Sequence, residues 1–105
     1  MDIMVVGGGG REHAIIKKLR ENAGVERIYA LPGNGGIAMD AECFPVKATD
    51  IEGIKAFAKE HRPDYAVVAP DDPLVMGCVD ELTNIGIPCF GPKAAAAVIE
   101  GSKVF

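Results

Sequence analysis

The segment that decides the fold runs from Val5 to Ala14 and reads VVGGGGREHA. Residues 2–6 are typical of a short buried strand, and the pattern after the glycines becomes helical. Four glycines at a strand-to-helix turn leave no Cβ between the backbone and a ligand. The amides and the dipole of the new helix favour an anion there. The segment therefore predicts a site for a phosphate or a sugar phosphate; the alternative is a glycine-rich turn without a ligand.

The glycines do not fit two common nucleotide-binding loops. A dinucleotide loop has the pattern G-x-G-x-x-G, and counting from Gly7 or Gly8 places Glu12 or His13 at the third glycine. The acidic residue expected at the end of the second strand is also missing, because residues 27–31 run directly into a proline. No Gly-Lys-Ser/Thr follows the glycines, so the Walker pattern fails too. A nicotinamide or flavin site is therefore disfavoured.

Size and charge are those of one soluble globular domain. The chain has 105 residues, of which 49% are hydrophobic and 25% are charged. Its formal net charge of −4 argues against a nucleic-acid surface, where a basic stripe is expected. A small anionic ligand stays compatible with this charge, because backbone amides can hold a phosphate.

The cysteines and the apolar runs favour the cytoplasm. Cys43, Cys78 and Cys89 form no C-x-x-C pair, and an odd number without close spacing favours buried thiols over disulfides or zinc. No apolar run approaches the roughly 18 residues of a membrane span, and the start of the chain lacks the basic leader of a signal peptide. We expect a cytoplasmic protein that contacts neither membrane nor nucleic acid.

Strand-like and helical segments alternate along the whole chain. We expect strands at residues 3–6, 27–31, 43–46, 65–69 and 87–90, and helices at residues 11–22, 50–62, 74–85 and from Lys93 onward. Thr49 or Asp50 can cap the second helix. This order, with short connections, predicts a three-layer α/β fold in which helices cover both faces of a parallel sheet.

Three unusual loops follow the expected strands. They are Gly7–Gly10, Pro32–Gly36 and Pro70–Pro73. Ligands of such sheets bind beyond the carboxyl ends of the strands. We therefore expect these loops to meet at one crevice.

Five motifs in order resemble phosphoribosylamine–glycine ligase, also called glycinamide ribonucleotide synthetase. They are Gly7–Ala14, Pro32–Asn34, Pro70–Leu74, Phe90–Pro92 and Glu100–Lys103, and they extend over the whole chain. The resemblance implies that residues 1–105 are the single Rossmann-like N-terminal (pre-ATP-grasp), substrate-binding domain of a longer ATP-grasp ligase. The apolar end at Phe105 also leads us to expect a domain within a longer protein.

The resemblance also implies an activity for the parent enzyme. ATP activates glycine as an acyl phosphate, the amine of 5-phosphoribosylamine attacks it, and glycinamide ribonucleotide, ADP and phosphate are released. ATP and Mg²⁺ would bind to ATP-grasp domains absent from this chain, so the fragment alone would be inactive. Its partners would be the small-molecule substrate and the remaining domains of the same enzyme.

Residue roles implied by the resemblance concern substrate binding only, with no catalytic or metal-binding residue in this chain. The expected substrate-binding residues are Gly8, Gly9, Gly10, Arg11, Glu12, Asn34 and Asp71. Amides of the glycines would contact the sugar phosphate, Arg11 and Glu12 would orient its polar groups, and Asp71 would accept hydrogen bonds from ribose hydroxyls. The structural alternatives are an ion pair between Arg11 and Glu12 at the helix start and a helix cap at Asp71 or Asp72.

Two positions depart from the family pattern. Gly8 replaces the usual Asn, so an amide side chain is lost from the loop. Asp71-Asp72 replaces the usual Glu-Ala. Because aspartate is one methylene shorter than glutamate, a hydroxyl contact from Asp71 would need a shorter distance to the ligand or a bridging water. For His13, on the first helical turn, we expect a structural hydrogen bond rather than a metal or proton-transfer role. His61 is expected to have no functional role.

Two rival function classes stay open at this level. One is a stand-alone nucleotide- or coenzyme-binding module, against which the missing third glycine counts. The other is an interaction domain without a ligand, in which the glycine loop only connects the strand to the helix.

Overall fold

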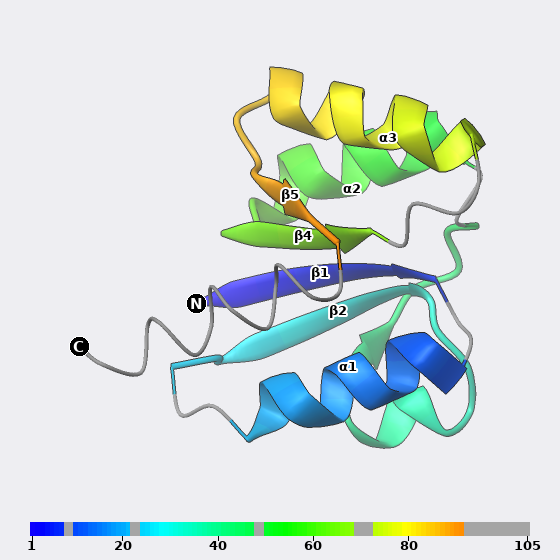
Figure 1. Cartoon of the computed structure of the whole chain (residues 1–105), viewed down its shortest axis with the longest axis vertical. Helices are drawn as coiled ribbons and strands as arrows, with labels where there is room; N and C mark the ends of the chain where they lie inside the picture. The colour runs from blue at the N-terminus through cyan, green and yellow to red at the C-terminus, as the bar shows by residue number, and fades with distance from the viewer. Residues whose placement is uncertain (8–9, 22–23, 48–49, 69–72, 92–105) are drawn as a thin grey trace.

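The computed structural model describes residues 1–7, 10–21, 24–47, 50–68 and 73–91, without the side chains of residues 10, 11 and 73–76. Its elements, in chain order, are β1 (Asp2–Gly7), α1 (Gly10–Arg20), β2 (Arg27–Pro32), the 3-10 helix η1 (Ile37–Met39), β3 (Glu42–Cys43), α2 (Ile51–His61), β4 (Tyr65–Val68), α3 (Pro73–Asn84) and β5 (Cys89–Phe90). This order agrees with the alternation expected from the sequence (Figure 1).

The strands form one parallel sheet in the order β3-β2-β1-β4-β5. Strand β1 lies at its centre and pairs with both β2 and β4. Gly7 stands opposite Pro32, and Val6 stands opposite Val68, so these three strands end at the same edge. We call it the carboxyl edge.

Helices cover both faces of the sheet, with α1 and η1 on one face and α2 and α3 on the other (Figure 1). Alternate residues of β1 supply the two cores, because successive side chains of a strand point to opposite faces. Ile3 and Val5 pack on the α1 side, and Met4 and Val6 pack on the side of α2 and α3. The expected three-layer α/β fold is confirmed.

Several element boundaries differ from the sequence expectation. Helix α1 ends at Arg20, whereas we expected residue 22, and Pro32 belongs to β2 rather than to the following loop. The third strand was expected at 43–46, but it is Glu42–Cys43, because the amide of Val46 bonds to the carbonyl of Phe44 (2.7 Å) and turns the chain.

The last described strand is also shorter than expected. The amide of Ile87 donates to the carbonyl of Leu82 (3.0 Å) and so belongs to the turn that ends α3, leaving Cys89–Phe90 as β5. Residues 70–72 of the expected turn and the expected helix from Lys93 lie outside the described residues, and Pro73, which we expected in that turn, is the first residue of α3.

Asp50 caps helix α2. Its carboxylate accepts a hydrogen bond from the amide of Gly53 (3.0 Å), so of the two expected caps Asp50 is the one observed. Ile54, Phe57 and Ala58 on the inner face of α2 are buried, which joins the capped helix to the core.

The cap gives a stability prediction. Asp50→Ala removes the acceptor for a first-turn amide and should lower the free energy of unfolding by about 1 kcal/mol. Asp50→Asn keeps a side-chain oxygen at the same position and should lower the free energy of unfolding much less. Urea unfolding of both variants measures the difference; equal losses would show that the hydrogen bond to Gly53 does not stabilise α2.

Candidate functional site

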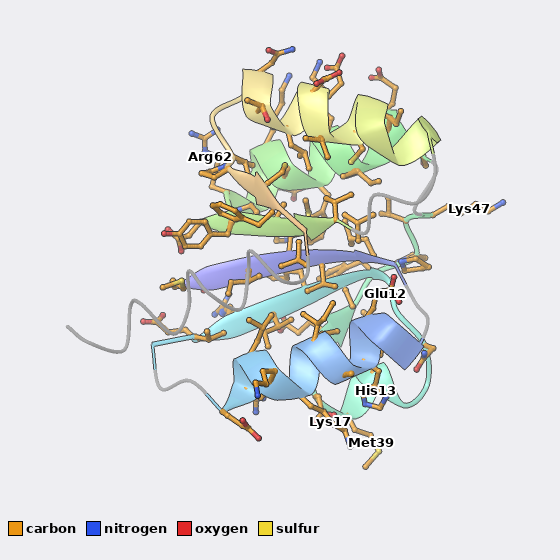
Figure 2. The ribbon with its side chains drawn as sticks, viewed as in Figure 1. Glu12, His13, Lys17, Met39, Lys47 and Arg62 are labelled. Carbon is orange, nitrogen blue, oxygen red and sulfur yellow. The ribbon has the colours of Figure 1, made fainter. Side chains whose placement is uncertain are left out.

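Gly7 ends β1 with a backbone φ of +136°, which L side chains rarely adopt. A Cβ built there would lie 2.6 Å from Oε1 and 2.7 Å from Cγ of Glu12. The side chain of Glu12, from the first turn of α1, therefore lies directly over the end of β1. Figure 2 shows Glu12 at the carboxyl edge. Only a glycine permits both this backbone conformation and this close contact.

The loop after β2 is held against the end of β1. The amide of Gly33 donates to the carbonyl of Gly7 (3.2 Å), which joins the ends of the two neighbouring strands. The peptide bond between Leu31 and Pro32 is cis. Gly33 also lies against the Cys43 thiol, where a Cβ would clash with Sγ. The first two of the three expected loops thus meet at one edge.

Asn34 organises the loop that it belongs to. Its Oδ1 accepts a hydrogen bond from the amide of Ile37 (2.8 Å), and its carbonyl accepts one from the amide of Ala38 (2.9 Å). The side-chain oxygen therefore holds the amide of the first residue of η1, a local side-chain-to-backbone hydrogen bond typical of Asn in turns. This local role is one that the sequence-based assignment of Asn34 to substrate binding did not include.

His13 makes the structural hydrogen bond that we expected. Its Nε2 lies 3.2 Å from Oδ2 of Asp40, at the end of η1. His61 packs in an aromatic cluster, stacked on Phe57 with ring centroids 3.9 Å apart, and its Nδ1 bonds to the carbonyl of the same residue (3.1 Å). Both histidines thus have identified structural contacts.

The remaining expected site residues are described only in part. Gly10 is the first residue of α1, and Arg11 follows it with its side chain undescribed. Gly8, Gly9 and Asp71 lie outside the described residues. The described part of the carboxyl edge therefore brings together the start of α1, Glu12 and the Asn34 loop.

Lys47 is a residue at this edge that the sequence analysis did not consider. It follows β3, is exposed, and points away from the molecule on the same side as Glu12 (Figure 2). A single lysine in a loop carries no motif, so only the position of β3 in the sheet could have identified it.

A depression lies away from the carboxyl edge. It has a volume of about 270 Å³, and it is lined by the end of α1, the start of β2 and residues 38–42, including Arg20, Arg27, the exposed Met39 and Asp40. A hydrogen bond from Arg27 to Tyr29 and nearby acidic charges raise the pKa of the Arg27 guanidinium. This depression lies at the opposite end of β2 from the glycine loop.

Of the three cysteines, which we expected to be buried, Cys78 is buried, whereas Cys43 and Cys89 are only partly buried. All three cysteines are free, and burial raises the pKa of both Cys78 and Cys89 to about 11. Their thiols therefore stay protonated near neutral pH, and thiols are poor metal ligands and nucleophiles in that form. Among the described residues, no group of three or more His, Cys, Asp or Glu side chains is arranged to hold a metal ion.

The contact between Gly7 and Glu12 gives a second stability prediction. Gly7→Ala combines backbone strain with displacement of the Glu12 side chain, so the free energy of unfolding should fall by clearly more than about 1 kcal/mol. Gly86→Ala is the matched control, because Gly86 also has a positive φ (+86°) but nothing lies within 4 Å of its Cβ position. Equal losses of unfolding free energy in the two variants would contradict the close contact with Glu12.

None of the helices in the described part of the chain is long and apolar enough to span a membrane.

The family model described as "Phosphoribosylglycinamide synthetase, N domain" matches residues 1–100.

Curated relatives named phosphoribosylamine–glycine ligase match the whole chain. The one from Caldanaerobacter subterraneus subsp. tengcongensis is 50% identical over 105 residues, which cover 100% of this chain and 25% of the relative. Those from Listeria monocytogenes serotype 4b and Allochromatium vinosum are 49% and 44% identical, and again 100% of this chain matches 25% of each relative. The chain thus spans a quarter of the length of these relatives. With the family model matched over nearly its whole length, the chain belongs to the phosphoribosylglycinamide synthetase N-domain family.

Proposed function

We propose that this chain is the ribonucleotide-binding N-terminal domain of a phosphoribosylamine–glycine ligase. The observation that carries the proposal is the alignment of the whole chain with a ligase of that name at 50% identity. The parent enzyme would act in purine biosynthesis in the cytoplasm. It would join the carboxyl group of glycine to the amine of 5-phosphoribosylamine and release glycinamide ribonucleotide, ADP and phosphate.

In this proposal the chain binds one substrate, and other domains bind the rest. ATP and Mg²⁺ would be held by ATP-grasp domains of the parent enzyme, where the metal ion neutralises phosphate charge. The contribution of residues 1–105 would be to hold the sugar phosphate so that its amine is correctly placed for attack.

The carboxyl edge has features that suit a sugar phosphate. Helix α1 begins at Gly10, and the first amides of a helix have no partner within the helix. Together with the helix dipole they favour an anionic group. We assign these amides, with those of Gly8 and Gly9, to the sugar phosphate. Arg11 would orient the same group.

Acceptors at the same edge suit the ribose and the amine. The carboxylate of Glu12 lies over Gly7 and can accept hydrogen bonds from hydroxyl or amine groups. Asp71 follows β4, which ends opposite β1, and we assign it to the ribose hydroxyls. Asn34 would contact the substrate from the second loop while its side-chain oxygen accepts the hydrogen bond from Ile37.

The coenzyme-binding alternative requires a small residue where Glu12 stands. In dinucleotide loops the third glycine permits close packing of the helix on the strand. Here the Glu12 side chain fills that space over Gly7. This contact favours the ligase domain over a nicotinamide site.

Asp71 provides a test in the full-length ligase. Asp71→Ala should weaken ribonucleotide binding by one to two decades, because a lost hydrogen bond to a charged group costs roughly 1.5–3 kcal/mol. The Michaelis constant for ATP should stay unchanged. Asp72→Ala is the matched control. An unchanged Michaelis constant for phosphoribosylamine in Asp71→Ala would reduce Asp71 to a structural role.

Gly9 tests the glycine loop itself. A methyl group at Gly9 should block the approach of the sugar phosphate, lowering the affinity for glycinamide ribonucleotide at least about tenfold, the loss of one strong polar contact. The melting temperature should fall by a few degrees at most. Calorimetric titration measures affinity, with NADH as the control ligand for the coenzyme-binding alternative. A variant with a much lower melting temperature but normal affinity for glycinamide ribonucleotide would show that the loop has only a structural role.

A further inference from the structure

His13 connects two segments that are far apart in the sequence. It lies in the first turn of α1, and its Nε2 is 3.2 Å from Oδ2 of Asp40, 27 residues further along. A carboxylate can only accept, so Nε2 donates the proton of this bond. Asp40 is the residue directly after η1 and forms its C-cap. In Figure 2, His13 reaches from α1 toward the η1 segment.

The ring of His13 also contacts the start of η1. A Cβ built at Gly36 would lie 3.2 Å from Cε1 and 3.5 Å from Nδ1 of the ring. Gly36 has an ordinary helical backbone (φ −70°, ψ −41°), so its conformation does not require glycine. The absence of a side chain at Gly36 therefore makes room for the imidazole. His13 thus touches the residues at both ends of η1.

The segment held by His13 is itself tied to the carboxyl edge. The side-chain oxygen of Asn34 accepts a hydrogen bond from the first amide of η1, and the amide of Gly33 donates to the carbonyl of Gly7. A continuous series of contacts therefore runs from the start of α1 through η1 to the loop after β2 and back to the end of β1. Moving His13 or Asp40 would shift the loop that contains Asn34 relative to the first amides of α1.

We propose that His13 and Asp40 are positioning residues for the ribonucleotide site. Their contact fixes the distance between the start of α1 and the Gly33–Gly36 loop, and neither residue touches the substrate. This inference rests on the proposed function, since it concerns the geometry of that site. The side chains of His13 and Asp40 are 28% and 32% exposed, and a polar contact this exposed to water adds little to stability. The contact should therefore affect substrate binding more than folding.

The test uses the full-length ligase and a double-mutant cycle. His13→Ala and Asp40→Ala should each weaken glycinamide ribonucleotide binding by about tenfold, since small misplacements of binding groups are costly. The double variant should bind no more weakly than either single variant, because the two residues act through one contact. The Michaelis constant for ATP and the melting temperature should change little.

Milder variants keep the test valid where alanine disturbs folding. His13→Gln retains an N–H donor toward Asp40 and should restore most of the affinity. Gly36→Ala should weaken binding by pressing on the His13 ring. Gly35→Ala is its matched control and should bind like the wild type, because nothing lies within 4 Å of the Cβ position of Gly35.

Each contrary outcome has a distinct meaning. A wild-type ligase that did not bind glycinamide ribonucleotide through this domain would contradict the proposed function. If the wild type bound and the variants bound equally well, or if the two alanine substitutions had additive effects, the positioning role would be wrong. Equal affinity in Gly36→Ala and Gly35→Ala would also overturn it.

Discussion

The pairing of β1 with strands on both sides is the constraint on which the rest of the structure depends. Residues Ile3–Val6 are at most 3% exposed, and they supply side chains to the cores on both faces of the sheet. The parallel register sets Gly7 opposite Pro32 and Val6 opposite Val68. The described loop after β2 and the start of α1 are therefore both placed relative to the end of one strand, β1.

A site built on this edge depends on backbone more than on charge. The chain carries a net charge of −4, yet amides at the start of a helix can bind an anion without basic side chains. Side chains near the edge also have structural roles: Glu12 covers Gly7, Asn34 accepts a hydrogen bond from the first amide of η1, and His13 bonds to Asp40. The polar groups that we assign to substrate binding and those that shape the loops are thus closely interconnected.

The sequence predicted the layers and the order of the elements because hydrophobic periodicity and glycines at turns are local signals. The sequence predicted the bounds of the short strands β3 and β5 less accurately. Whether residues 44–46 or 87 belong to a strand depends on hydrogen bonds to Phe44 and Leu82, which a local pattern does not reveal. At the candidate site, the sequence predicted substrate-binding roles for Glu12 and Asn34, which stay predictions, and it did not indicate the partner of His13. Asp40 lies 27 residues away, and only the packing of η1 against α1 brings the two together.

The most direct test of the central claim is a crystal structure of the full-length ligase with glycinamide ribonucleotide bound. We predict that the sugar phosphate lies at the carboxyl edge, against the backbone of Gly9 and Gly10, with Glu12 within hydrogen-bonding distance of the ligand. A ribonucleotide bound instead in the depression beside Arg20 and Met39, or nowhere on this domain, would contradict the account.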